Sequence, residues 1–385
     1  AGHYHCSFDS VLQRNLHPLS KDLQKEAKSV DERLRKEEKL SYHILLPRFL
    51  FRFLFGLHLA LFQVAYKNND PDPRLCVNPT STVSKTDNGN ANAQIPDPGA
   101  PGRHEENPPI YYGTAFIRQM VWLWNLRISY PHEDILQLAD DVSAAFHRIL
   151  YDPLMALVFA TVWGMYLVIP VGTIFGARNS PSFYMEAGET RSHLAGSWPD
   201  ATSLPLQDLA EQVVLPPSPT PAAAAAFAQA VADSQHHGIA NPHSSNPERR
   251  LPSFVDDSCT AHVAWYFRTA INVVVWAARV VFGFPQEDPT RPPCINPFKW
   301  IKDAAPRVKF LGFLLDTRQM LVIWPLDKRA KLSALILELL SQQAPPHRRG
   351  STPQSIAKIL GLLRHGAMVA PLGALQTLRL QFFLN

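Results

Sequence analysis

Segments with hydrophobic residues at helical spacing alternate along this chain with shorter segments that have a strand-like period. The helical spacing predicts helices over 20–41, 43–66, 111–130, 180–195, 260–283, 325–341 and 352–365. The strand-like runs predict strands at 74–77 and 135–141, a hairpin within 153–177, a strand and turn at 251–260, and a hairpin at 308–324. A short helix over 143–150 is predicted directly after the strand at 135–141. The chain is therefore expected to combine helices with strands.

Two segments interrupt this pattern. Residues 67–110 are dominated by Pro, Asn, Gly and Asp, which predicts loop with one short strand at 74–77. Residues 199–250 are rich in Pro and Ala and have the composition of a linker. Within them, Pro221 at a first helical position predicts one helix.

Two apolar stretches are long enough to require a test for membrane insertion. Residues 153–177 contain no charge over 25 positions, but Gly164 and Pro170 interrupt them, which favours a buried hairpin. Residues 45–62 carry arginines and a histidine that are costly in lipid. Neither stretch is expected to cross a membrane.

Composition narrows the class of protein. The chain has 385 residues, of which 46% are hydrophobic and 18% charged, so a globular protein of two or three sub-domains is expected. Its 4 cysteines form no CxxC pair, which favours a reducing intracellular compartment, cytoplasm or nucleus. Residues 299–385 carry 13 Lys and Arg against 4 Asp and Glu, compared with 37 against 33 in the whole chain. Such a basic segment favours a polyanionic partner.

Three acidic residues stand where predicted strands end. Asp141 ends an apolar strand, and Asp256 and Asp257 follow the short strand-like run that includes Phe254. Carboxylates brought together at such strand ends repel one another, and divalent cations with a preference for oxygen ligands relieve the repulsion. This arrangement predicts a cofactor of two Mg²⁺ ions about 4 Å apart, with Mn²⁺ as an alternative ion.

Five short stretches follow one another in a particular order: DVSAAF at 141–146, FGARNSPSF at 175–183, FVDD at 254–257, Lys299 within INPFKW, and VKFLG at 308–312. In this order they resemble the first four motifs and the primer-grip hairpin of the reverse transcriptase palm of retrotransposon polyproteins. Upstream, Lys67 and Arg74 resemble the fingers residues that hold a triphosphate. The resemblance covers about residues 41–385 and is nearest to eukaryotic retrotransposon enzymes. Residues 352–385 favour the tyrosine-recombinase kind only weakly.

The resemblance implies an α+β right-hand polymerase fold with RNA-directed DNA polymerase activity. It implies an N-terminal charged extension at 1–40, fingers at 41–134, a palm at 135–324, and a helical thumb with the start of a following region at 325–385. The palm would be an antiparallel sheet backed by helices, with the segment 199–250 as a spacer. The partners would be an RNA template, a DNA primer and a dNTP. RNase H and integrase or recombinase regions are expected elsewhere in the same polyprotein.

The resemblance also assigns roles to single residues. The implied metal ligands are Asp141, Asp256, the weaker Asp257, and Val142. The implied dNTP-binding residues are Lys67, Arg74, Val142, Phe146, Gly176 and Lys299. Backbone amides from Val142 to Phe146 would donate to the triphosphate. Phe146 would exclude a 2′-hydroxyl, and Lys299 would donate a proton to pyrophosphate. The implied primer and template contacts are Ser180, Pro181, Phe310, Leu311, Gly312, Lys328, Arg329 and Lys331.

Some features depart from the family pattern or leave alternatives open. Asn78 stands where the fingers motif usually has Asp, and the spacer at 184–253 is long. The alternative for Phe146 is an ordinary core aromatic, and the alternative for Lys67 and Arg74 is solvated loop charges. An RNA-dependent RNA polymerase on the same palm and a decayed element that only binds nucleic acid are the alternative functions.

Overall fold

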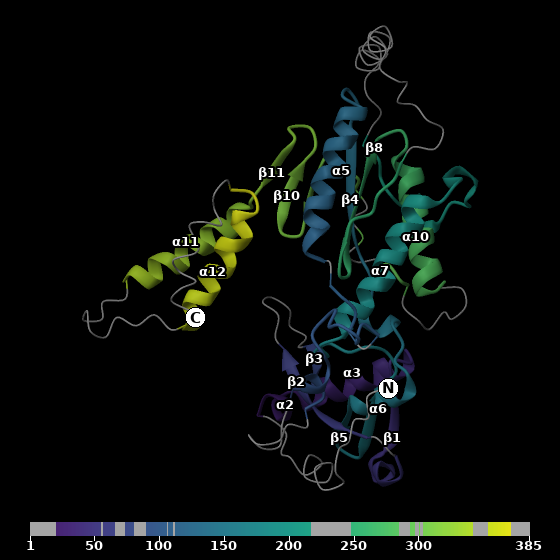
Figure 1. The fold of residues 1–385 in the computed structure, drawn as a ribbon, viewed down its shortest axis with the longest axis vertical. Coiled ribbons are helices and arrows are strands. Elements are labelled where there is room, and N and C mark those ends of the chain that lie inside the picture. Colours follow the sequence, from purple (N-terminus) through teal and green to yellow (C-terminus); the bar gives the residue numbers. More distant parts are fainter. Residues whose placement is uncertain are drawn as a thin grey trace.

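The computed structural model describes most of the chain and combines helices with largely antiparallel sheets, which confirms the predicted α+β class (Figure 1). The described residues are 21–54, 57–65, 74–80, 90–105, 107–110, 112–216, 248–284, 293–296, 300, 303–341 and 353–370. Lys67, Lys299 and the helix predicted at Pro221 lie outside the described residues. Within the described ranges, none of the helices combines the length and the apolar character needed to cross a membrane.

Strands from two separate parts of the chain form a sheet beside the N-terminal helices (Figure 1). Its order in the described part of the chain is β1-β6-β5-β2-β3, with β2 and β5 parallel and the other neighbours antiparallel. The strands are β1 His43–Pro47, β2 Leu59–Ala65, β3 Arg74–Asn78, β5 Ala160–Trp163 and β6 Tyr166–Pro170. The helices and helical turns of this region are α2 Lys21–Lys25, α3 Ala27–Lys39, η1 Arg48–Phe53, α4 Ala91–Gln94 and α6 Pro153–Val158. Leu23, Val30 and Leu34 bury the apolar stripe of α2 and α3 against this sheet.

The structure corrects one prediction in this region and confirms others. The described parts of 43–66 form β1, η1 and β2 and not the predicted helix or helix pair, because β1 and β2 pair with β6 and β5, which lie far away in the sequence. The short strand at 74–77 is confirmed by β3. The hairpin predicted around Gly164 is confirmed as β5 and β6. The first residues of the stretch 153–177 form the helix α6 instead. The Asp152 carboxylate caps this helix by accepting from the Leu154 N–H at 2.9 Å.

A second, antiparallel sheet carries the predicted acidic residues. In the described residues its order is β4-β8-β7, with β4 Ile135–Asp141, β7 Ser253–Phe254 and β8 Asp257–Val263. The remaining helices and turns around it are η2 Tyr112–Thr114, α5 Ala115–Ser129, η3 Phe146–Arg148, α7 Ser180–Ser197, η4 Ala201–Ser203, α8 Asp208–Glu211 and α10 Phe267–Phe282. Helix α5 lies on one side of β4 and β8, and α7 and α10 on the other (Figure 1). This sheet backed by helices agrees with the expected architecture.

The layers follow from the alternation of side chains along β4. Ile135 points into a core that includes Phe116 and Trp122 from the start and middle of α5. Leu136 and Leu138 point into a second core that includes α10 side chains such as Ile271 and Val275. Because strand residues alternate between faces, neighbouring residues at the end of β4 also point to opposite sides of the sheet.

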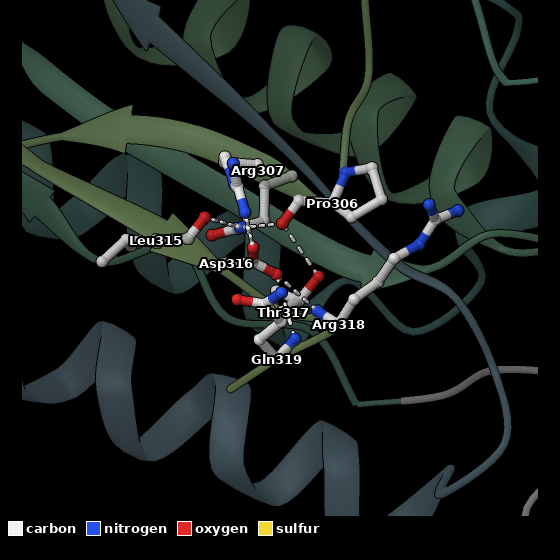
Figure 2. A network of polar contacts seen from close by, with 8 residues as sticks. Pro306, Arg307, Leu315, Asp316, Thr317, Arg318 and Gln319 are labelled. Carbon is white, nitrogen blue, oxygen red and sulfur yellow. Dashed lines mark hydrogen bonds and ion pairs between the residues drawn. The ribbon is translucent and has the colours of Figure 1, made fainter. Parts of the chain in front are cut away.

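The C-terminal part begins with three antiparallel strands, one more than the predicted hairpin, and continues into the two predicted helices. The elements are β9 Arg307–Phe310, β10 Phe313–Asp316, β11 Leu321–Ile323, α11 Leu326–Ser341 and α12 Pro353–Ala367. Figure 2 shows the polar network at the end of β10, where Asp316 accepts from Arg307 Nε at 2.9 Å and from the backbone N–H groups of Arg318 and Gln319, each at 3.0 Å.

The same network anchors the hairpin on the acid-bearing sheet. Thr317 Oγ1 donates to the Ile135 carbonyl at 2.6 Å, and Gln137 Nε2 donates to the Pro306 and Leu315 carbonyls at 3.0 and 3.2 Å. Gln137 is fully buried, so its amide nitrogen has to find its acceptors within the protein, and these two carbonyls supply them. The β9–β10 hairpin is therefore held at a defined place beside β4.

Candidate active site

The three acidic residues predicted from the sequence meet at one end of β4 and β8. Asp141 and Asp257 are partners in the antiparallel register, and Asp256 lies in the turn that joins β7 to β8. One carboxylate oxygen from each lies within 4.8 Å of the others. Asp141 is buried, Asp256 is half-buried and Asp257 is exposed. The cluster therefore opens toward solvent on one side.

Backbone hydrogen bonds hold the acid-bearing segments in place. The Val142 N–H donates to the Asp256 carbonyl at 3.1 Å, and the Asn296 N–H donates to the Asp141 carbonyl at 2.9 Å. Val255, in the turn, has φ of +52°, a left-handed conformation that is rare for a β-branched residue and costs roughly 1–2 kcal/mol. Such strain persists only where the surrounding structure imposes it, and it is often found at functional sites.

The donor set fits a divalent cation. Three carboxylates offer the hard oxygen ligands that Mg²⁺ and Mn²⁺ prefer. Three negative charges this close together also repel one another, and a bound cation removes that cost. The cluster can therefore hold a metal ion.

The segment after Asp141 differs from the predicted helix over 143–150. It forms a turn followed by the single helical turn η3, because the left-handed conformation of Ala144 interrupts a right-handed helix. The Val142 and Ser143 amides donate to the Asp256 and Cys294 carbonyls, at 3.1 and 2.8 Å. These two amides, expected as donors to a triphosphate, are thus already used within the protein. Ala144 has φ of +50°, which places a second strained residue next to the acids.

Phe146 lies in an aromatic cluster below this turn. Its ring centroid is 4.7 Å from that of Phe175 and 5.8 Å from that of Tyr184, both edge-to-face, and the residue is 8% exposed. Phe175 belongs to the second motif, so the structure brings the first and second motifs together. Val142 is almost fully buried.

The loop of the second motif lies against β3. Gly176 has φ of +109°, and an added Cβ would collide with the Val77 carbonyl oxygen. Its own carbonyl accepts from Asn92 Nδ2 at 2.8 Å, and Asn92 Oδ1 accepts from Arg178 N–H at 2.9 Å. Ser180 and Pro181 follow as the first residues of α7, with Ser180 buried, as the sequence predicts for the start of that helix. Arg74 is the first residue of β3, the strand against which this loop lies.

Gly176→Ala is expected to destabilise the folded chain by about 2 kcal/mol, because the new methyl group meets a backbone oxygen and φ is positive. Gly164→Ala is the matched control. Gly164 also has a positive φ, +57°, but has nothing within 4 Å of an added Cβ, so we expect a loss of about 1 kcal/mol. Urea-induced unfolding of both variants measures the difference, and equal losses would contradict the contact with β3.

A cavity of about 690 Å³ separates the acid-bearing strands from the C-terminal helices. Asp257 and Ser258 line one wall and residues 309–313 of the β9–β10 hairpin line another, while Lys328 from α11 and His365 from α12 complete it. Burial, followed by the charge of Lys309, lowers the pKa of Lys328. The cavity thus brings two separate parts of the predicted site to one place.

The turn of this hairpin has positive φ at both central residues, +47° at Leu311 and +82° at Gly312. His365 fixes the turn from outside, with Nε2 3.0 Å from the Leu311 carbonyl and the ring stacked on Phe313 at 4.2 Å. Phe310 is buried in the core beneath. Arg329 and Lys331, the other predicted contacts on α11, are exposed.

Two polar residues at the site were not found by sequence reasoning. Arg191 on α7 is 2% exposed and forms an ion pair with Asp140, and His365 contacts the hairpin turn. Neither residue belongs to a local sequence pattern that indicates a function: Arg191 lies on a helix with both polar and apolar residues, and His365 lies near the C-terminus. Only the tertiary structure shows their contacts.

Neither a protein-family model nor a curated protein matches this chain. Among solved structures, it is similar to the foamy viral protease-reverse transcriptase in complex with double-stranded DNA, with a TM-score of 0.47 and 12% identity over 91% of this chain. It is also similar to the same viral protein in complex with an RNA/DNA hybrid, with a TM-score of 0.46, 13% identity and the same share of this chain. The telomerase from Candida albicans, in complex with a fragment of telomeric RNA, follows with a TM-score of 0.38 and 9% identity over 89% of this chain. The chain spans 41% and 31% of the two foamy viral chains and 57% of the telomerase chain.

Proposed function

We propose that this chain is an RNA-directed DNA polymerase domain of a retrotransposon, which adds dNTPs to the 3′-hydroxyl of a primer. The observation that carries the proposal is the meeting of three carboxylates, supplied by two distant segments, at the end of one antiparallel sheet. These are the acids of the first and third motifs, and the Phe146–Phe175 contact joins the first motif to the second. The order of the motifs in the sequence and their meeting in space are separate observations that support the same function.

In this proposal Asp141 and Asp256 hold the cations, with Asp257 and the Val142 carbonyl as further ligands. Divalent cations bound there would supply the positive charge that phosphoryl transfer needs at the reacting phosphate. The protein's own task is to position the groups, which the strand register and the strained turn at Val255 support. Mg²⁺ is the expected ion, and Mn²⁺ is expected to replace it.

The surrounding elements suggest the path of the substrates. The sheet of β1–β3, β5 and β6 would serve as fingers, so β5 and β6 would move from the expected palm range 135–324 to the fingers. Arg74 and, outside the described residues, Lys67 would neutralise the triphosphate. Lys299, also outside them, would act near the leaving pyrophosphate. The loop at Gly176, Ser180 and Pro181 would contact the templating pair. The primer would lie in the cavity between the palm and the helices α11 and α12, whose lining includes Phe310, Leu311, Gly312 and Lys328. Arg329 and Lys331, exposed on α11 outside that lining, would contact the nucleic-acid backbone.

Primer extension tests the proposal. The purified chain is given an RNA template, an annealed DNA primer, dNTPs and Mg²⁺, and product length is followed on a denaturing gel. We expect extension that depends on Mg²⁺ or Mn²⁺ and stops with EDTA. Salt-sensitive binding of the RNA–DNA duplex without extension would favour a decayed element instead, and extension with NTPs in preference to dNTPs would favour an RNA polymerase.

Phe146→Ala is expected to raise ribonucleotide use relative to deoxynucleotide use by about tenfold or more, because the ring is proposed to occupy the space of a 2′-hydroxyl. Phe282→Ala is the matched control, since Phe282 has the same 8% exposure and stacks on Tyr184 in the same core. Both variants leave a cavity that costs about 3–4 kcal/mol, so their general effects on folding should be alike. Single-nucleotide incorporation with dNTP and NTP gives the ratio, and an equal change in both variants would leave Phe146 as a core residue only.

A further inference from the structure

A buried ion pair lies directly beside the acid cluster, on the opposite face of the sheet. Arg191 Nη1 donates to Asp140 Oδ1 at 2.9 Å and to Ser258 Oγ at 3.0 Å, and Ser258 Oγ donates to Asp140 Oδ1 at 2.7 Å. The three residues are at most 3% exposed. Arg191 belongs to α7, so the pair joins a helix to the strands β4 and β8.

The position of this network relates it to the acids. Asp140 and Ser258 are partners in the antiparallel register, and the next pair along the same two strands is Asp141 and Asp257. Because neighbouring residues on a strand point to opposite faces, Asp140 meets Arg191 on the helix side while Asp141 faces the acid cluster. A shift of register at the first pair would move the second pair as well.

Stability alone does not account for the pair. Asp140 Oδ2 and Arg191 Nε and Nη2 are buried and have no hydrogen-bond partner among the described residues. A buried ion pair with unsatisfied polar atoms contributes little net stability, and apolar residues of similar volume often replace such pairs at no cost. The guanidinium group of Arg191, however, stays protonated and donates to Asp140 on β4 and to Ser258 on β8, so it ties both strands to α7.

We propose that Arg191 is a positioning residue for the metal site: through Asp140 and Ser258 it locks the strand ends that carry Asp141 and Asp257. The inference rests on the proposed function, because it assumes that the carboxylates bind a cation. It goes beyond that function by assigning a role to a residue outside all five motifs. Arg191 acts through Asp140 and Ser258 and touches neither nucleotide nor metal.

Mn²⁺ binding, measured by electron paramagnetic resonance, and urea-induced unfolding in EDTA test this role separately. The double variant Asp140→Leu with Arg191→Met removes the charges but keeps the volume, so we expect it to be at least as stable as the native chain. Its Mn²⁺ affinity is expected to fall by about tenfold or more, as when partners of metal ligands are lost. Arg191→Lys keeps the charge and is expected to retain affinity within about threefold.

Arg249→Met is the matched control. Arg249 is also buried, but it bonds to the Ala195 carbonyl at 3.1 Å and the Tyr266 hydroxyl at 2.7 Å, away from the strand ends. We expect this variant to lose stability while Mn²⁺ affinity stays unchanged. Ser258→Ala, which removes a single hydroxyl, serves if the double variant does not fold, and is expected to weaken Mn²⁺ binding by a few-fold.

The outcomes separate this inference from the proposed function. Native Mn²⁺ affinity in the double variant, or in Ser258→Ala where the double variant is unfolded, would overturn the role of Arg191 and leave the polymerase proposal standing. Absence of Mn²⁺ binding by the native chain would overturn both. Weakened binding in the double variant, with Arg191→Lys near the native affinity, would support the inference even if the chain alone extends no primer.

Discussion

Asp141→Asn and Asp256→Asn are each expected to reduce primer extension by about three orders of magnitude. Each change replaces a charged carboxylate ligand with a neutral amide in the cluster where three acids approach within 4.8 Å. Charge stabilisation is the main contribution of a protein to phosphoryl transfer, so loss of one ligand affects the transition state most. Asp257→Asn is expected to have a smaller effect, because Asp257 is the exposed member of the cluster.

The same variants should not lose stability in the absence of metal. Removing one of three mutually repelling charges leaves the free energy of unfolding unchanged or raises it, whereas added Mg²⁺ should stabilise the native chain more than the variants. Urea-induced unfolding with and without Mg²⁺ provides this comparison, and Glu186→Gln, an exposed acid on α7, is the control for the change of charge. Full extension by both Asp141→Asn and Asp256→Asn would end the metal assignment.

Local sequence patterns were sufficient for β4 and for the turn after β7, but not for the whole of β8. Residues 260–263 of that strand lie in the stretch predicted as the helix 260–283, and α10 begins only at Phe267. An apolar run that ends in Asp141 predicts β4, and the Phe254–Asp257 stretch predicts a strand and turn, and both are confirmed. That the two segments pair in one register is a long-range property, and only the resemblance to a known family implied it. The structure supplies the register itself, in which Asp141 lies opposite Asp257.

Other parts of the fold could not be predicted because their partners lie far away in the sequence. The apolar run 43–66 suits a helix as well as strands, and its pairing with β5 and β6 decides the outcome. Residues 143–150 form only the helical turn η3 because Ala144 is left-handed, in a turn whose neighbouring amides bond to carbonyls of two later segments. Arg191 shows the same limit at the level of a single residue, since its partners come from β4 and β8.

Acid is expected to destabilise the chain through His262, a buried residue of β8. The ring lies against Tyr266, with centroids 4.7 Å apart, and is 1% exposed. Its Nδ1 accepts from the Val263 N–H at 2.9 Å and its Nε2 lies 3.0 Å from the Glu248 carbonyl, which fits a neutral ring with the proton on Nε2. Burial lowers the pKa of His262 to about 4 from the ordinary value of 6.5.

Because this pKa is lower in the folded than in the unfolded chain, the unfolded chain takes up a proton first as the pH falls. The contribution of the neutral His262 ring to the free energy of unfolding is complete above about pH 6.5 and is lost as the pH falls toward 4. Between about pH 7.5 and about pH 4.5 the free energy of unfolding falls by about 2.5 kcal/mol from this source. His147, whose pKa burial also lowers to about 4, adds to the loss over the same range.

His262→Gln tests this expectation, because the amide nitrogen of Gln can still donate to the Glu248 carbonyl but the side chain does not titrate. Urea-induced unfolding of the native chain and the variant is followed from about pH 7.5 to about pH 4.5. The variant should lose about 2.5 kcal/mol less than the native chain over this range. His132→Gln, at an exposed position, controls for the substitution itself. Parallel pH profiles of the native chain and His262→Gln would show that the buried ring at 262 is not a source of acid sensitivity.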